Sequence, residues 1–105
     1  MSSNNQALNN KYCNLLDHKL NEIKLPFKRE FIIIDTGNII DFLIDNKIIV
    51  EVKAKQLILK ADYYQVQRYL QASNKKLALL VNFRNRYLKP IRVIRIDTDA
   101  KEKFI

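Results

Sequence analysis

The sequence predicts an α/β protein in which helices pack against a mixed sheet. Two long segments, around residues 5–22 and 61–73, carry apolar residues at helical spacing, and three short strand-like segments lie between them. The segment 77–81 is almost uniformly apolar, which is typical of a strand buried on both faces. The elements therefore follow one another in the order α-β-β-β-α-β-β.

The first half of the chain contains one helix and a three-stranded meander. An apolar stripe with i, i+4 and i+7 or i+8 spacing marks a helix over about 5–22, and Pro26 lies beyond its end. The turn residues Asp, Asn and Gly separate the apolar runs that follow. The predicted strands cover residues 31–34, 39–44 and 48–54, with turns at 35–38 and 45–47.

The second half contains a crossover helix and two more strands. In the helix predicted over 61–73, Tyr63, Val66 and Leu70 share one face. The strand at 77–81 is expected beside the meander, because a crossover helix joins parallel neighbours. In the last segment, 91–96, arginines alternate with apolar residues, so this strand should lie nearer an edge of the sheet.

Composition limits the class of protein. The 105 residues suffice for one domain, 1–105, and the net charge of +8 favours polyanionic partners, with nucleic acid before an anionic membrane surface. A solvated lysine-rich face is the alternative explanation of this charge. The single cysteine, Cys13, excludes an internal disulfide and fits the reducing cytoplasm. The sequence predicts neither a membrane span nor a signal peptide.

Three charged residues lie inside segments that should be buried strands. Asp41 interrupts the apolar run 39–44, and Glu51 and Lys53 interrupt the run 48–54. Because burying an unpaired charge costs several kcal/mol, acids and a lysine held together there indicate a binding site. A divalent cation is the ligand that suits the two acids.

The hairpin turn decides whether these charges meet. Alternation along a strand sends Glu51 and Lys53 to the same face. A three-residue turn at 45–47 pairs Ile44 with Ile48, and therefore places Asp41 opposite Glu51 on that face. A two-residue turn would send Asp41 to the other face. We expect the three-residue turn, because it unites the charges.

Two opposed carboxylates repel each other, and a hard cation between them removes that penalty. Mg²⁺ prefers oxygen ligands, so Asp41, Glu51 and the carbonyl of Val52 form a reasonable half-site. Lys53 could orient an attacking water or offset charge on a phosphate. The alternative is a simple ion pair of Lys53 with either acid on a solvated face of the sheet.

These residues resemble the D…(D/E)xK core of the PD-(D/E)XK nuclease superfamily, and more narrowly the small proteins named for a GxxExxY motif. The resemblance implies a restriction-endonuclease-like αβββαβ core with a mixed central sheet. It also implies that Asp41 and Glu51 hold Mg²⁺ or Mn²⁺, that Lys53 assists the nucleophile and that Gln65 lines the same pocket. The similar segments are 25–30, 40–47, 50–54, Gln65 with 68–70, and 79–83.

The chain departs from the GxxExxY pattern on its first helix. If Tyr12 is aligned with the tyrosine of the motif, Gln6 stands at its glycine and Asn9 at its glutamate. In many relatives an acid on this helix adds to the metal site, and Asn9 supplies no charge. Either two acids suffice here, or the metal is bound weakly, or cleavage has been lost.

Basic residues gather after the second helix, with Tyr87 among them, and this pattern predicts contacts with phosphates. The predicted contact residues are Lys75, Lys76, Arg84, Arg86, Lys89, Arg92 and Arg95.

The leading hypothesis is a metal-dependent nuclease that hydrolyses phosphodiester bonds, in DNA rather than RNA. A catalytically degenerate nucleic-acid-binding module and an assembly protein on the same fold are the alternatives. A homodimer would help a small core to grip a duplex.

Overall fold

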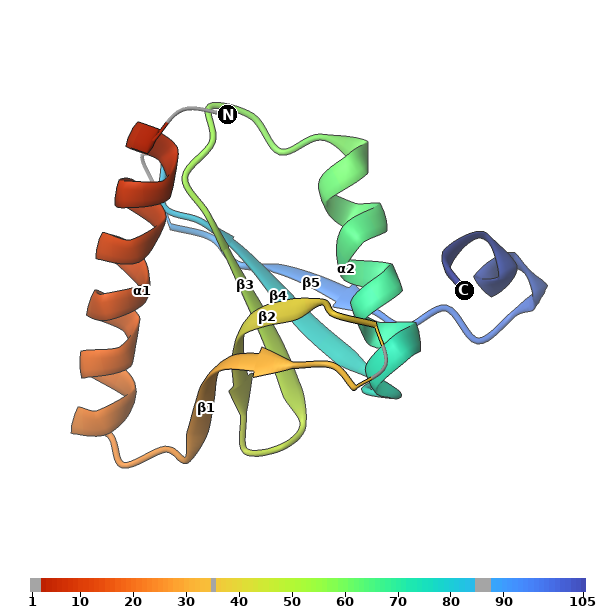
Figure 1. Cartoon of the computed structure of the whole chain (residues 1–105), viewed down its shortest axis with the longest axis horizontal. Coiled ribbons are helices and arrows are strands. Elements are labelled where there is room, and N and C mark those ends of the chain that lie inside the picture. The colour runs from red at the N-terminus through yellow and green to blue at the C-terminus, as the bar shows by residue number, and fades with distance from the viewer. Residues whose placement is uncertain (1–2, 35, 85–87) are drawn as a thin grey trace.

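The computed structural model describes residues 3–34, 36–84 and 88–105. The chain forms a five-stranded mixed sheet in the order β1-β2-β3-β4-β5, and this sheet lies between helices α1 and α2 (Figure 1). The elements are α1 (Ser3–Glu22), β1 (Phe27–Ile32), β2 (Ile39–Ile44), β3 (Ile48–Lys53), α2 (Lys60–Ser73), β4 (Leu77–Asn82), β5 (Ile91–Ile94) and the 3-10 helix η1 (Asp99–Phe104).

The strand connections confirm the predicted topology. β1, β2 and β3 form an antiparallel meander, and β4 lies parallel to β3 after the crossover through α2. β5 pairs antiparallel with β4 at the edge of the sheet, as its alternating sequence predicts. The chain therefore has the αβββαβ order, followed by an edge strand and η1.

The predicted bounds of the two edge strands were wrong. β1 begins at Phe27 rather than Phe31, because residues 27–32 pair with the length of β2, with half-buried and exposed side chains alternating along the strand. An edge strand tolerates the three consecutive charged residues at 28–30, and these charges concealed it in the sequence. β5 ends at Ile94 rather than Ile96. Beyond this point the side chain of Gln67 takes the place of a neighbouring strand, because it donates to the carbonyl of Ile94 and accepts from the N–H of Ile96.

The turn between β2 and β3 has the three residues that the sequence predicts. Asp45 and Asn46 have positive φ angles of 51° and 55°, a conformation that Asp and Asn tolerate better than most residues. Ile44 pairs with Ile48, and the pairing continues to Phe42 and Val50. This register brings residues 41 and 51 next to each other.

The core has one cluster on each face of the sheet. Residues of β2 and β3 such as Phe42 and Val50 pack with α1, and Leu43 and Ile49 pack with α2. Leu70 is a fully buried member of the α2 cluster. The two clusters hold α1 and α2 against opposite faces of the sheet. They therefore also determine the space that remains between the two helices at one end of the sheet.

The helices have distinct packing roles. α1 and α2 each bury one side, and η1 packs on α2, where the rings of Tyr64 and Phe104 meet edge to face with centroids 5.2 Å apart. Among the described helices, none combines the length and apolar character that a membrane crossing requires.

Candidate active site

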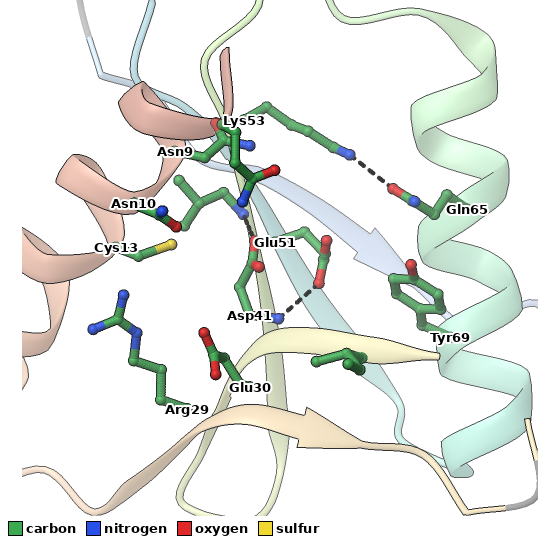
Figure 2. Close-up of a pocket in the computed structure, with 13 residues that line it drawn as sticks. Asn9, Asn10, Cys13, Arg29, Glu30, Asp41, Glu51, Lys53, Gln65 and Tyr69 are labelled. Carbon is green, nitrogen blue, oxygen red and sulfur yellow. Dashed lines mark hydrogen bonds between the residues drawn. The ribbon is translucent and has the colours of Figure 1, made fainter. Parts of the chain in front are cut away.

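The predicted site residues line one pocket of about 430 Å³. The pocket receives side chains from β1, β2 and β3 and from both helices, so it spans the end of the sheet between α1 and α2 (Figure 2). All five residues that the sequence predicts for the metal and the chemistry contribute to its lining: Asp41, Glu51, Val52, Lys53 and Gln65.

The two carboxylates are held side by side by hydrogen bonds to the backbone. The backbone N–H of Asp41 donates to Oε1 of Glu51 at 3.0 Å, and the N–H of Val52 donates to Oδ2 of Asp41 at 2.8 Å (Figure 2). Side-chain oxygens thus accept from backbone groups where the regular pairing of β2 with β3 ends. Each carboxylate keeps its second oxygen free of hydrogen bonds to the described residues.

β2 does not alternate regularly through this point. Leu43 and Ile40 both belong to the core cluster beneath α2, although three positions separate them, while Phe42 belongs to the cluster beneath α1. The prediction that all three charges share one regular face of the sheet is therefore too simple. The strand changes its orientation around Asp41, and the pocket reaches both helices as a result.

Burial raises the pKa of both acids. Glu51 is 5% exposed, and its burial, with the charge of Asp41 beside it, raises its pKa to about 8 despite the hydrogen bond from Asp41 and the charge of Lys53. Burial also raises the pKa of Asp41, although the Val52 N–H and the charges of Lys53 and Arg29 act in the opposite direction. A buried acid pair of this kind is stabilised by a bound cation.

Lys53 points along the pocket toward α2. Its Nζ donates to Oε1 of Gln65 at 2.8 Å and lies 3.8 Å from Oδ1 of Asp62 (Figure 2). Within the described part of the chain, Lys53 forms no ion pair with Asp41 or Glu51. The alternative explanation of these charges, a permanent lysine–carboxylate pair, is therefore not what the structure contains.

Helix α1 supplies a neutral polar wall opposite α2. Gln6, Asn9, Asn10 and Cys13 line the pocket. Oδ1 of Asn9 is buried and has no hydrogen-bond partner among the described residues. Burial, with the charge of Asp41, raises the pKa of the Cys13 thiol to about 11, so this thiol is protonated at neutral pH.

Tyr69 closes the α2 side of the pocket next to Gln65, one helical turn away. It is a buried residue, and burial together with the charges of Glu51 and Asp41 raises the pKa of its phenol. The charge of Arg68 and the neighbouring side chain of Gln65 partly offset this rise in the pKa of the same phenol.

Several residues at the site were missed by sequence reasoning. Arg29 lines the pocket and pairs with Asp17 of α1 at 3.4 Å. Glu30 also lines it, with a positive φ of 53° inside β1. Both lie on an edge strand whose charges look like ordinary solvated residues. No periodicity in the sequence could have placed them at the pocket.

Asn82 was missed as well. Its side chain is buried at the end of β4, where Nδ2 donates to the carbonyl of Lys55 at 2.8 Å and Oδ1 accepts from the N–H of Lys55 at 3.0 Å. The N–H of Phe83 donates to the carbonyl of Lys53. These bonds extend the β3–β4 contact past the end of β3 and fix the backbone that carries Lys53.

The structure does not gather the predicted phosphate contacts into one patch. Lys75 and Lys76 precede β4, and Arg84 follows it, so they lie at opposite ends of a strand about 16 Å long. Lys89 precedes β5 and lies near the same end as Arg84, which is the end that carries Lys53. Arg92 is exposed on the edge strand.

Two more of the predicted contacts differ from these. Arg95 forms an ion pair with Asp97 at 2.7 Å and a hydrogen bond with Asn74, so its guanidinium already has protein partners. Arg86 lies outside the described residues.

A mixed five-stranded sheet between two helices, with Glu51 and Lys53 near the end of its central strand and Asp41 beside them on β2, is the architecture of a restriction-endonuclease-like fold. The family model of the PD-(D/E)XK nuclease superfamily matches residues 5–96. The chain belongs to this superfamily, which confirms the broader resemblance; the narrower one, to the GxxExxY proteins, stays a prediction. Comparison with curated proteins gave no match, and comparison with solved structures gave none.

Divalent metal ions are general cofactors of this superfamily. The side chains around this pocket supply an incomplete set of ligands for such an ion. Over residues 3–34, 36–84 and 88–105, no group of three or more His, Cys, Asp or Glu side chains is placed to hold a metal. Two carboxylates with free oxygens and the unpartnered amide oxygen of Asn9 are nevertheless hard oxygen donors around one pocket. This chemistry fits a hard divalent ion with several waters retained.

Proposed function

We propose that this protein is a metal-dependent nuclease that binds DNA and hydrolyses its phosphodiester bonds. The observation that carries the proposal is the adjacent pair of half-buried Asp41 and buried Glu51, which is anchored by backbone N–H groups and is not neutralised by the nearby Lys53. A chain gains nothing in stability from two adjacent buried acids, so their presence supports a role in binding a cation.

The metal would be held by Asp41, Glu51 and the carbonyl of Val52, and it would be Mg²⁺ or Mn²⁺. When bound, such an ion polarises a phosphate oxygen and lowers the pKa of a bound water. The backbone bonds to the two carboxylates hold them in place, so that little reorganisation accompanies binding. Superfamily membership supports this assignment, because PD-(D/E)XK nucleases generally use divalent ions.

Lys53 would stabilise the negative charge that develops on the phosphate, or orient the attacking water. Its side chain is 17% exposed and is held at the edge of the pocket by Gln65, so its ammonium is partly dehydrated and fixed. A fixed charge in a poorly solvated site stabilises a developing anion more strongly than a mobile charge in water does. Gln65 would act through Lys53, by holding it.

The polyanionic substrate is proposed from the charge of +8. Arg84 and Lys89 lie at the end of the sheet that carries the pocket, so they would contact the backbone of a duplex whose scissile phosphate enters it. Lys75, Lys76 and Arg92 lie farther away and would contact more distant phosphates, or those of DNA gripped by a homodimer. Such contacts position a duplex without reading its sequence.

We further propose that the nuclease domain covers residues 1–105 and acts in the cytoplasm. The single cysteine, Cys13, is a buried free thiol, which suits a reducing compartment.

Cleavage of DNA tests the proposed function. Supercoiled plasmid should be cut in the presence of Mg²⁺ or Mn²⁺, and EDTA should stop the cutting. Glu51→Gln should lower the rate by about 100-fold or more while DNA retardation persists, because only the metal site has changed. Glu102→Gln, the same substitution at an exposed position of η1, should cut as wild type does. RNA of matched sequence should be cut more slowly than DNA.

A catalytically degenerate DNA-binding module is the second candidate. One observation favours it: among the described residues, no group of three or more His, Cys, Asp or Glu side chains is placed to hold a metal, and α1 lines the pocket with the neutral Asn9. Retardation of DNA without any metal-dependent cutting, unchanged in Glu51→Gln, would establish this module instead. A protein that retards no nucleic acid at about 50 mM salt, where phosphate contacts are strong, would be an assembly protein.

A further inference from the structure

The buried carboxylate of Asp62 lies between two lysines at the start of α2. It is 6% exposed, and its Oδ1 and Oδ2 accept from Nζ of Lys55 at 3.0 and 2.8 Å. Oδ1 also lies 3.8 Å from Nζ of Lys53. Asp62 is thus the acidic partner of both lysines that extend from the end of β3.

The helix terminus fixes the position of this carboxylate. Oδ2 of Asp62 accepts from the N–H of Leu59 at 2.8 Å, and the N–H of Asp62 donates to the Leu59 carbonyl at 2.9 Å. Burial alone would raise the pKa of Asp62, but the hydrogen bonds from Lys55 and Leu59 and the charges of both lysines outweigh it and lower the pKa. A fixed negative charge therefore stands at the α2 side of the pocket.

Among the described residues, both partners of the Lys53 ammonium are on α2. Gln65 accepts its hydrogen bond, and Asp62, three residues earlier on the same helix, supplies the opposite charge. The lysine side chain consequently extends toward α2, away from the paired carboxylates (Figure 2). A neutral amide by itself would hold an ammonium weakly against the attraction of two nearby acids.

The alternative position of Lys53 would block the site. Glu51 is buried and Asp41 beside it is half-buried, so an ammonium that moved between them would relieve their repulsion in place of a metal ion. The charge of Lys53 already acts on both acids at its present position. Something must therefore keep the lysine near the pocket without letting it enter the carboxylate pair.

We propose that Asp62 is a positioning residue that holds the ammonium of Lys53 against α2, so that the Asp41–Glu51 pair stays available to a divalent cation. This inference rests on the proposed function, in which that pair binds the cation. Asp62 does not line the pocket that contains the carboxylate pair, and it would act through Lys53.

A double-mutant cycle read out by Mn²⁺ binding tests the inference. The signal of free Mn²⁺ in electron paramagnetic resonance gives the affinity of wild type, Asp62→Asn, Lys53→Met and the double variant. Asp62→Asn, which can still accept the Leu59 N–H, should weaken Mn²⁺ binding about fivefold or more when Lys53 is present, and by less than about twofold when Lys53 is Met. Lys55→Met should not weaken Mn²⁺ binding, since Asp62 can still pair with Lys53 in that variant.

A second pair of variants controls for disruption of the start of α2. Glu and Gln both suit the third position of a capping box, so Asp62→Glu and Asp62→Gln differ chiefly in charge. Mn²⁺ binding should be about fivefold weaker in Asp62→Gln than in Asp62→Glu.

The outcomes separate the two proposals. Equal weakening by Asp62→Asn in both Lys53 backgrounds, or equal affinities in the Glu and Gln variants, would overturn the role of Asp62. Absence of Mn²⁺ binding by the wild type would instead refute the metal site on which the inference rests.

Discussion

Replacing Glu51 by Gln should stabilise the metal-free protein at alkaline pH. The pKa of Glu51 rises from its ordinary value of 4.5 to about 8, first because the side chain is buried and second because Asp41 lies beside it. Between these two pH values the folded protein holds a proton that the unfolded chain releases. The folded state then binds more protons, so the free energy of unfolding falls as the pH rises.

The magnitude follows from the same values. Each tenfold change in proton affinity corresponds to about 1.4 kcal/mol, so ionising Glu51 in the folded state costs on the order of 5 kcal/mol. This stability is fully present below pH 4.5 and is lost by about pH 8. Glu51→Gln is neutral at every pH. It should therefore match wild type near pH 4.5 and exceed it by several kcal/mol near pH 9.

Urea denaturation in EDTA, at intervals from pH 5 to pH 9, measures this difference. Glu102→Gln is the matched control, because its carboxylate is exposed on η1, and its stability should stay within about 0.5 kcal/mol of wild type. A Glu51→Gln protein that is no more stable than wild type at pH 9 would refute the reasoning, since the buried charge would then cost nothing.

Further predictions concern the same region. Binding of Mn²⁺ should displace the proton of Glu51 below about pH 8, so its affinity should rise with pH up to that value, and calorimetry in two buffers of different ionisation enthalpy should show proton release. Asn82→Leu should lower the free energy of unfolding by about 2 to 4 kcal/mol, because the N–H and carbonyl of Lys55 lose their partners; urea denaturation measures this. Gln67→Leu should lower it by about 1 to 3 kcal/mol and speed amide hydrogen exchange near Ile94, whose carbonyl accepts from Gln67 at 2.6 Å.

Much of the fold could be predicted from local patterns. Apolar periodicity located both helices, and the turn residues Asp45 and Asn46 fixed the register that joins β2 to β3. The uniformly apolar β4 was correctly expected inside the sheet. These features depend on residues close together in the sequence, and for that reason sequence reasoning found them.

The rest depends on contacts between distant segments. β1 was misplaced because the charges of an edge strand hide its pairing, and η1 went unpredicted because its one buried anchor is Phe104. At the site, Asp41 and Glu51 stood out as acids in apolar runs. Asp62 and Asn82 did not, because their burial arises only when α2 and β4 dock beside the end of β3.

The basic residues show the same limit. Lys75 and Arg84 are near each other in the sequence, but the whole of β4 separates them in space. Proximity along the chain therefore suggested a patch that the sheet pulls apart.

The central claim is that Asp41 and Glu51 together bind a divalent cation. Isothermal titration of metal-free protein with Mn²⁺, on wild type and on Asp41→Ala, tests it most directly. We predict a single site in the wild type and loss of that binding in Asp41→Ala, whose folding is verified by circular dichroism. A wild type that takes up no Mn²⁺, or an Asp41→Ala protein that binds it equally well, would contradict the claim.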